Sequence, residues 1–134
     1  KLEDKGFAKQ NNVVYCGFNE LLKGSDVISI HISLSSQTIG LIDANAFEKM
    51  KPTALLINTS RGECVNEKAL KKALDEKRIA GAGLDVYSVE PYKGFLLKYD
   101  KVITTPHIGG YAQEIRMKME MEAAENLIKG LTNE

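Results

Sequence analysis

Several residue types and patterns are scarce in this sequence of 134 residues. It has no tryptophan, two histidines and two cysteines, Cys16 and Cys64, which lie far apart and have no histidine close by in the sequence. This spacing matches no metal-binding motif, so we expect reduced cysteines, no metal site and a cytoplasmic location. No apolar run reaches the ~18 residues that a membrane-spanning helix needs, and the amino terminus lacks the apolar core of a signal peptide.

An excess of charge of either sign is also missing. The sequence has 18 basic and 18 acidic residues, and no basic cluster is longer than a pair such as Lys71-Lys72. A neutral protein without a basic patch gives no electrostatic reason to expect binding to nucleic acid or to an anionic membrane. With 43% apolar residues, the chain is long enough to form the core of one domain.

The most informative stretch is the apolar run at residues 54–57, which leads through small polar residues to Arg61 and Gly62. Four apolar residues without polar alternation predict a strand covered on both faces, as in parallel sheets flanked by helices. Arg61 then follows the carboxyl end of that strand, at the edge where α/β sheets bind ligands. Two interpretations of Arg61 stay open at this point: a ligand contact, or an arginine that is paired with a nearby carboxylate or simply exposed.

Other segments fit the same architecture. We expect strands at 26–31, 79–86 and 101–107, a short strand at 13–15, and helices at 20–23, at 44–50, from 67 onward and at 111–129. Asn19, Asp43 and Asn66 are the expected N-caps of the first three helices. Lys77 and Arg78 are expected in the last turn of the third helix. Strands that alternate with helices predict right-handed crossovers and a parallel sheet flanked by helices, an α/β fold.

The expected helix at 111–129 carries apolar residues on two sides. At 100° per residue these form two stripes, one of Ile115, Met119, Ala123 and Leu127 and one of Met117, Met121, Ala124 and Ile128. We expect a helix with two apolar stripes to pack on the sheet and also on a second domain or a second subunit. The alternative is burial of both stripes within this one domain.

Each of the four stronger predicted strands ends at a polar or charged residue. These are His31, Arg61, Asp85 and His107, and Glu90 follows shortly after Asp85. An arginine can hold an anionic substrate by paired hydrogen bonds, and a histidine oriented by a carboxylate can exchange a proton near neutral pH. This combination fits redox chemistry at a carbon that bears a hydroxyl group, because the hydroxyl proton must leave when the hydride leaves.

Five short motifs support that interpretation: HISL at 31–34, NTSRG at 58–62, GLDV at 83–86, VEP at 89–91 and TPHIGG at 105–110. In this order and spacing, the sequence resembles the D-isomer-specific 2-hydroxyacid dehydrogenases, the family of phosphoglycerate, glyoxylate/hydroxypyruvate and D-lactate dehydrogenases. The resemblance covers nearly the whole chain. It implies a Rossmann-like fold, a homodimer, and hydride transfer between NAD and a small 2-hydroxy or 2-oxo acid, with NADP as the alternative cofactor.

The resemblance also implies roles for individual residues. Arg61 would bind the substrate carboxylate and carbonyl, His107 would be the acid/base, and Glu90 would be its carboxylate partner. The residues that line the cofactor would be Ile32, Thr59, Ser60, Arg61, Asp85, His107, Gly109 and Gly110. We do not expect His31 to be catalytic, although it too ends a strand.

The sequence departs from the family pattern in two mild ways and one large one. Ser33 stands where proline is usual, and Cys64 stands where an aliphatic residue is usual. The phosphate-binding loop G-x-G-x-x-G has no counterpart, because Gly81 and Gly83 lie in a predicted strand and do not open a helix. We therefore interpret residues 1–134 as part of a NAD-binding domain, last helix included, and expect this polypeptide alone to be inactive. The alternative function is non-catalytic, a co-regulator that dimerises through its last helix.

Overall fold

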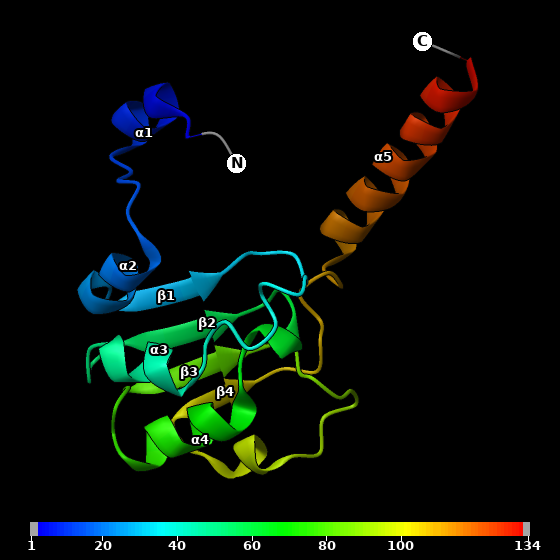
Figure 1. Cartoon of the computed structure of the whole chain (residues 1–134). Coiled ribbons are helices and arrows are strands. Elements are labelled where there is room, and N and C mark those ends of the chain that lie inside the picture. The colour runs from blue at the N-terminus through cyan, green and yellow to red at the C-terminus, as the bar shows by residue number, and fades with distance from the viewer. Residues whose placement is uncertain (1–2, 133–134) are drawn as a thin grey trace.

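The computed structural model describes residues 3–132, in which four parallel strands form one sheet (Figure 1). The strands are β1 (Val27–Ile30), β2 (Leu55–Asn58), β3 (Gly81–Leu84) and β4 (Val102–Thr104), and they lie side by side in sequence order. The parallel α/β sheet predicted from the sequence is confirmed. All four strands end in one row, whose members pair in register across the sheet: Ile30, Asn58, Leu84 and Thr104. The loops that follow therefore leave the sheet along a single edge.

Five α-helices and two short 3₁₀ helices accompany the sheet in residues 3–132. They are α1 (Lys5–Asn11), α2 (Phe18–Gly24), α3 (Ala44–Lys49), η1 (Gly62–Cys64), α4 (Glu67–Asp75), η2 (Phe95–Lys98) and α5 (Gln113–Thr132). Two predicted N-caps are confirmed. Asp43 accepts a hydrogen bond from the N–H of Ala46 at 2.9 Å, and Asn66 accepts one from the N–H of Ala69 at 3.0 Å. Each bond satisfies an amide that the first helical turn leaves without a partner.

The segment before β1 differs from its prediction. Residues 13–15 form no strand, because they connect α1 to α2 and pair with no strand of the sheet. Helix α2 begins at Phe18, so Gly17 and not Asn19 is the residue before it, and no side chain caps it. A β-branched pair is thus too weak a signal for a strand when no neighbour is available to pair with it.

The end of α4 also differs from its prediction. The helix ends at Asp75, so Lys77 and Arg78 lie beyond its last turn. Lys77 adopts a left-handed conformation with φ 56°, and the N–H groups of Lys77 and Arg78 donate to the carbonyls of Leu74 and Ala73. This is the Schellman pattern of helix termination, here with lysine at the position that glycine usually occupies.

The core lies between one face of the sheet and helices α2, α3 and α4 (Figure 1). Ile28 and Leu56 are buried on that face, whereas Val27 and Leu55 are 57% and 41% exposed on the other. The prediction that residues 54–57 are covered on both faces is therefore wrong within the described chain. The reason is topological, since right-handed crossovers between strands in simple sequence order place their helices on the same side of the sheet.

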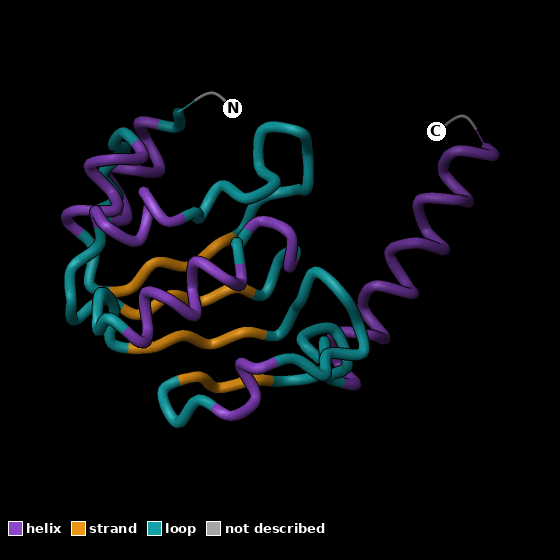
Figure 2. Tube along the Cα trace, turned by 60° about the horizontal axis from the view of Figure 1, so that its bottom comes forward, coloured by secondary structure: helices purple, strands orange, loops and turns teal. Residues whose placement is uncertain are grey.

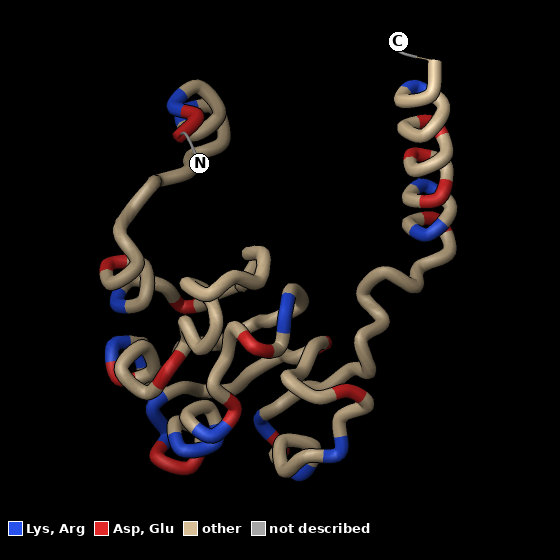
Figure 3. Tube along the Cα trace, turned by 45° about the vertical axis from the view of Figure 1, so that its right-hand side comes forward, with Lys and Arg blue, Asp and Glu red and all other residues tan. Residues whose placement is uncertain are grey.

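Helix α5 projects away from the sheet, as Figure 2 shows from a second direction. None of its described residues is buried, and both apolar stripes are exposed. The prediction that α5 packs on the sheet is wrong, and so is the alternative of burial within this domain. Figure 3 shows basic and acidic residues interspersed along the helix, where Arg116 pairs with Glu120 and Lys118 with Glu122. Neither α5 nor any other helix in residues 3–132 is long and apolar enough to cross a membrane.

Gly62 lies against the backbone of Tyr87, where a side chain has no room. A Cβ added at Gly62 would overlap the carbonyl carbon and oxygen of Tyr87. We expect Gly62→Ala to lower the free energy of unfolding by about 3 kcal/mol or more, because backbone atoms cannot move aside as a flexible side chain can. Urea denaturation measures this loss. Gly24→Ala is the matched control, since a Cβ there meets no atom within 4 Å; equal losses in both variants would contradict the close packing at Gly62.

Candidate active site

Polar residues begin all four loops at the carboxyl edge of the sheet. His31 follows β1, residues 59–61 follow β2, Asp85 follows β3 and Thr105 follows β4. Because the strand ends are in register, these loops start side by side. In open parallel sheets this is the edge where nucleotides and substrates bind.

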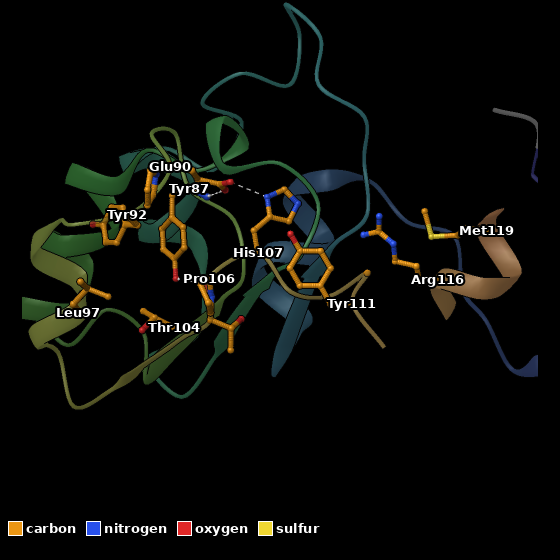
Figure 4. A pocket seen from close by; sticks show the side chains of 13 residues that line it. Tyr87, Glu90, Tyr92, Leu97, Thr104, Pro106, His107, Tyr111, Arg116 and Met119 are labelled. Carbon is orange, nitrogen blue, oxygen red and sulfur yellow. Dashed lines mark hydrogen bonds and ion pairs between the residues drawn. The ribbon is translucent and has the colours of Figure 1, made fainter. Parts of the chain in front are cut away.

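His107 and Glu90 form a hydrogen-bonded pair at this edge (Figure 4). Nδ1 of His107 lies 2.8 Å from Oε2 of Glu90, and Oε1 of Glu90 accepts a hydrogen bond from the backbone N–H of Tyr87 at 3.0 Å. The bond with His107, and after it the bond from Tyr87, holds the pKa of Glu90 below its ordinary value. An ionised Glu90 makes Nδ1 the donor, which leaves Nε2 as the nitrogen that can exchange a proton with a bound molecule.

A pocket of about 670 Å³ opens beside this pair. Its walls come from the loops after β3 and β4 and from the start of α5, with these side chains labelled in Figure 4: Tyr87, Glu90, Tyr92, Leu97, Thr104, Pro106, His107, Tyr111, Arg116 and Met119. The rings of Tyr87 and Tyr92 stack with their centroids 4.1 Å apart. The His107 side chain is 52% exposed, so a molecule that enters from solvent can reach it.

Arg61 lies in a turn that the buried side chain of Asn58 holds in place. Nδ2 of Asn58 donates to the carbonyl of Arg61 at 2.9 Å, and Oδ1 accepts from the N–H and the hydroxyl of Ser60 at 3.1 and 3.0 Å. Nη1 of Arg61 donates to the carbonyl of Ser60 at 2.7 Å. No carboxylate among residues 3–132 forms an ion pair with Arg61. Its positive charge is therefore available to an anionic ligand.

Arg61 and His107 line different pockets. Arg61 and Ser60 line a second pocket, of about 520 Å³, together with residues 31–34. His31 belongs to this second pocket, and its Nε2 lies 2.7 Å from the hydroxyl of Ser29. The structure thus brings Glu90 to His107 and Arg61 to the loop after β1, but it does not gather the three predicted catalytic residues around one cavity.

Asp85 is buried beneath the loop that carries His107. Its carboxylate accepts hydrogen bonds from the hydroxyl of Thr105 and from the N–H groups of Ile108 and Gly109, the latter two at 2.9 and 2.8 Å. Burial by itself would raise the pKa of Asp85, but these three bonds outweigh it and lower the pKa. A Cβ on Gly109 would come within 3.0 Å of Oδ2, so the loop packs closely on the carboxylate.

The other residues predicted to line the cofactor lie along the same edge. Ile32 and Ser60 line the second pocket, Gly110 lines the first, and Thr59 directly follows β2. A Cβ on Gly110 would meet no atom within 4 Å, so the backbone there is open to a ligand. Small and hydroxyl-bearing residues at such an edge suit a dinucleotide. Their contact with a cofactor stays a prediction.

The two cysteines take no part in this site. Cys16 is exposed, and Cys64 is buried in the core, where burial raises the pKa of its thiol. Across the described residues, no group of three or more His, Cys, Asp or Glu side chains is placed to hold a metal ion.

Three residues organise the site although the sequence predicts no individual role for them: Asn58 and Thr105, which lie in the motifs at 58–62 and 105–110, and Tyr87. Asn58 could have been recognised, because a polar residue that ends a buried apolar strand needs hydrogen-bond partners close by. Tyr87 and Thr105 give no such signal. The hydroxyl of Tyr87 shares its proton between the carbonyls of Leu84 and Thr105, at 3.0 and 3.2 Å, so its role depends on a residue that follows β4 and lies 18 residues away in the sequence.

Sequence comparison relates the chain to known proteins. The model of one family, described as the NAD-binding domain of D-isomer specific 2-hydroxyacid dehydrogenases, matches residues 2–109. A glyoxylate reductase from Korarchaeum cryptofilum is 44% identical over 124 residues, which cover 91% of this chain and 37% of that protein. The chain therefore spans little more than a third of the length of this relative.

Two solved structures resemble the chain in fold as well as in sequence. The D-mandelate dehydrogenase of Rhodotorula graminis matches with a TM-score of 0.89 at 31% identity, over 96% of this chain and 38% of that one. A D-isomer specific 2-hydroxyacid dehydrogenase from Lactobacillus delbrueckii ssp. bulgaricus, in its NAD-complexed form, matches with a TM-score of 0.86 at 29% identity, over 98% and 44% of the two chains. The shared fold covers nearly all of this chain and less than half of each of these structures.

Proposed function

The chain belongs to the family of D-isomer specific 2-hydroxyacid dehydrogenases, through their NAD-binding domain, and we propose that it supplies the catalytic part of that domain to an oxidoreductase. The enzyme would transfer a hydride between a nicotinamide cofactor and a D-2-hydroxy acid or 2-oxo acid. The observation that carries this proposal is the contact of 2.8 Å between His107 and Glu90 at the carboxyl edge of a parallel sheet. A proton donor oriented by a carboxylate, beside a nucleotide-binding edge, is what the reduction of a carbonyl needs.

His107 is the proposed acid/base. In reduction, the hydride adds to C2 of the 2-oxo acid while the proton on Nε2 of His107 moves to the carbonyl oxygen, which becomes the hydroxyl. In oxidation, Nε2 takes the hydroxyl proton as the hydride leaves C2. Glu90 holds Nδ1, which fixes the orientation of the ring and favours the imidazolium that this step requires.

Arg61 is the proposed contact for the substrate carboxylate and carbonyl. Its guanidinium forms no ion pair in the described chain, and it can donate two parallel hydrogen bonds to a carboxylate. Because Arg61 and His107 stand on loops of the same edge but line different pockets, a substrate held by both would lie between the two pockets.

NAD is the proposed cofactor, with NADP as the alternative, and when bound it supplies or accepts the hydride. The residues that would hold it are those predicted from the sequence, namely Ile32, Thr59, Ser60, Arg61, Asp85, His107, Gly109 and Gly110. The support for this placement is the open edge with its hydroxyl groups and its unobstructed glycine backbone at Gly110. The acidic residue that would choose between the two cofactors by contacting the ribose has no counterpart in this sequence.

We propose that residues 1–134 act within a longer polypeptide, since they match only 37% of the length of the glyoxylate reductase relative. The remainder would supply the glycine-rich loop and the substrate domain. A polypeptide of these 134 residues alone is expected to reduce no 2-oxo acid, because the backbone donors that bind a pyrophosphate at a helix amino terminus are not among its motifs. Measurable turnover by that polypeptide would contradict this expectation.

We also propose a cytoplasmic homodimer. The support is α5, whose apolar residues are exposed, Met121 and Ile128 to 61% and 60%. The alternative is that α5 packs on a second domain of the same polypeptide. Light scattering on the full-length protein separates the two, because a dimer has twice the mass of the chain, and a monomer at micromolar concentration would contradict the dimer.

We expect Glu90→Gln to shift the pH profile of kcat/KM for reduction toward acid. The bond with His107 lowers the pKa of Glu90, so the ionised carboxylate and the positively charged ring stabilise each other. The amide keeps the shape of the side chain but removes this negative charge. The profile is measured between pH 5 and 9 with NADH held saturating. An unchanged profile would show that the two side chains do not meet in the working enzyme.

The proposed function is tested by titrating full-length protein with NADH and then screening 2-oxo acids for turnover. Binding together with turnover supports a dehydrogenase. Binding without turnover of any 2-oxo acid would favour the non-catalytic co-regulator, which no relative reported above supports.

A further inference from the structure

Residues 88–91 form the tip of the loop between β3 and η2, and this loop tip carries Glu90. The loop tip forms no backbone–backbone hydrogen bond with any other segment of residues 3–132. Val89 is 73% exposed, so burial does not hold it either. The bond from the N–H of Tyr87 to Glu90 lies within the same loop (Figure 4). The loop tip therefore needs side-chain contacts to other elements to keep its position.

Glu67, the first residue of α4, supplies such a contact. Its Oε1 accepts a hydrogen bond from the N–H of Ser88 at 3.1 Å and another from the hydroxyl of Ser88 at 2.8 Å. One oxygen atom thus receives both donors of a residue that lies 21 positions away in the sequence. Apart from the bond between Glu90 and His107, these are the hydrogen bonds that join the loop tip to another element of the described chain.

Helix α4 is a firm support for this contact. Leu70 and Leu74 on the same helix are buried in the core, and a side chain on a packed helix has a better-defined position than one on a loop. Glu67 is half-buried, and a negative charge in the first turn is favoured by the helix dipole. Because Ser88 is only two residues from Glu90, the contact restrains the segment whose carboxylate bonds to the histidine.

We propose that Glu67 is a positioning residue, which holds the loop tip so that Glu90 meets His107 before a substrate binds. It acts through Ser88, since Glu67 is not among the residues that line either pocket. Without it, the bond to the histidine would itself have to order the loop tip, at a cost in conformational entropy. The catalytic part of this role rests on the proposed function, whereas the restraint of the loop does not.

The first measurement needs no turnover. Amide hydrogen exchange is followed by NMR in the full-length protein and in Glu67→Ala. The Ser88 amide loses its acceptor, so its exchange should accelerate by about 10-fold or more. The Tyr87 amide donates to Glu90, and it should exchange at least about 3-fold faster if the loop tip moves. Faster exchange at Ser88 alone would overturn the proposal, because Glu90 would then keep its place without Glu67.

The second measurement compares two substitutions of Glu67. Glu67→Ala is expected to lower kcat for reduction of a 2-oxo acid by about 3- to 10-fold and to leave the Kd for NADH within about 2-fold. Glu67→Gln lacks the charge but keeps an oxygen that can accept both bonds from Ser88, so it should retain kcat within about 2-fold. Equal losses of kcat in the two variants would show that the hydrogen bonds are not what matters.

A double-mutant cycle identifies the residue through which Glu67 acts. In a Glu90→Ala background, Glu67→Ala should lower kcat no further, because the carboxylate that it positions is gone. The same fold-loss in both backgrounds would overturn the proposal, since general damage to the fold would add to the loss of Glu90.

Glu20→Ala is the matched control, because Glu20 is an exposed glutamate in the first turn of another helix, α2. It should change neither the exchange of the Tyr87 amide nor kcat. A loss of kcat equal to that of Glu67→Ala would assign the effect to helix charge and contradict the proposal. Absence of turnover in the unmodified protein would contradict the proposed function, while exchange at Tyr87 would still decide whether Glu67 holds the loop tip.

Discussion

In the full-length protein, His107→Ala is expected to lower kcat for reduction of a 2-oxo acid by about 10³-fold, while the Kd for NADH changes little. The reason is that His107 is the one histidine among the residues that line the larger pocket, and its Nε2 is available when Nδ1 is bound to Glu90. Without it, the proton for the carbonyl oxygen must come from water. Stopped-flow NADH oxidation measures the rate, and fluorescence titration measures cofactor binding.

His31→Ala is the matched comparison, since it removes the same type of side chain from another strand end. His31 lines the second pocket and pairs with Ser29, so its loss is expected to cost far less than the loss of His107. Comparable rates for His107→Ala and the unmodified protein would remove the acid/base assignment. A larger loss from His31→Ala than from His107→Ala would transfer the assignment to the other pocket.

Arg61→Lys is expected to raise KM for the 2-oxo acid and to lower kcat, reducing kcat/KM by about 10²- to 10³-fold. Lysine keeps the charge but cannot donate two parallel hydrogen bonds to a carboxylate. Asn58 should still hold the turn, because it bonds the backbone of Arg61 and not its side chain.

Arg78→Lys is the control for this change, because Arg78 is exposed and forms a surface ion pair with Glu76. It should leave kcat/KM within about 2-fold of the unmodified protein, as surface ion pairs contribute little. An Arg61→Lys variant that behaves like Arg78→Lys would show that Arg61 does not touch the substrate.

Local patterns were sufficient to predict the parts of the fold that depend on local physics. The apolar run at 54–57 marks β2, and Asp43 and Asn66 cap α3 and α4 with the expected hydrogen bonds. Strand ends are also local features, so the residues at the carboxyl edge could be named in advance. Their chemistry follows from residue type, which is why His107 and Glu90 could be proposed as a pair that the structure then places 2.8 Å apart.

Other features depend on topology and could not be read from any one segment. The run at 54–57 looked buried on both faces, but strands in sequence order place their crossover helices on one face, and Leu55 remains exposed. The apolar stripes of α5 indicate that another surface packs on this helix, but they do not identify that surface. Tyr87 and Thr105 also give no local signal, because the hydrogen bond between them joins the segments that follow β3 and β4. The separation of Arg61 and His107 into two pockets likewise emerges only in three dimensions.

We propose that a protein carrying this chain moves a hydride between a nicotinamide and C2 of a 2-hydroxy acid. The most direct measurement incubates full-length protein with a panel of 2-oxo acids and NADH that carries deuterium at C4 of the nicotinamide, and then analyses the products by mass spectrometry and chiral chromatography. We expect deuterium at C2 of a 2-hydroxy acid of D configuration, formed by the unmodified protein and greatly reduced in His107→Ala. Saturable NADH binding without deuterium transfer to any 2-oxo acid, or transfer that His107→Ala leaves undiminished, would contradict it.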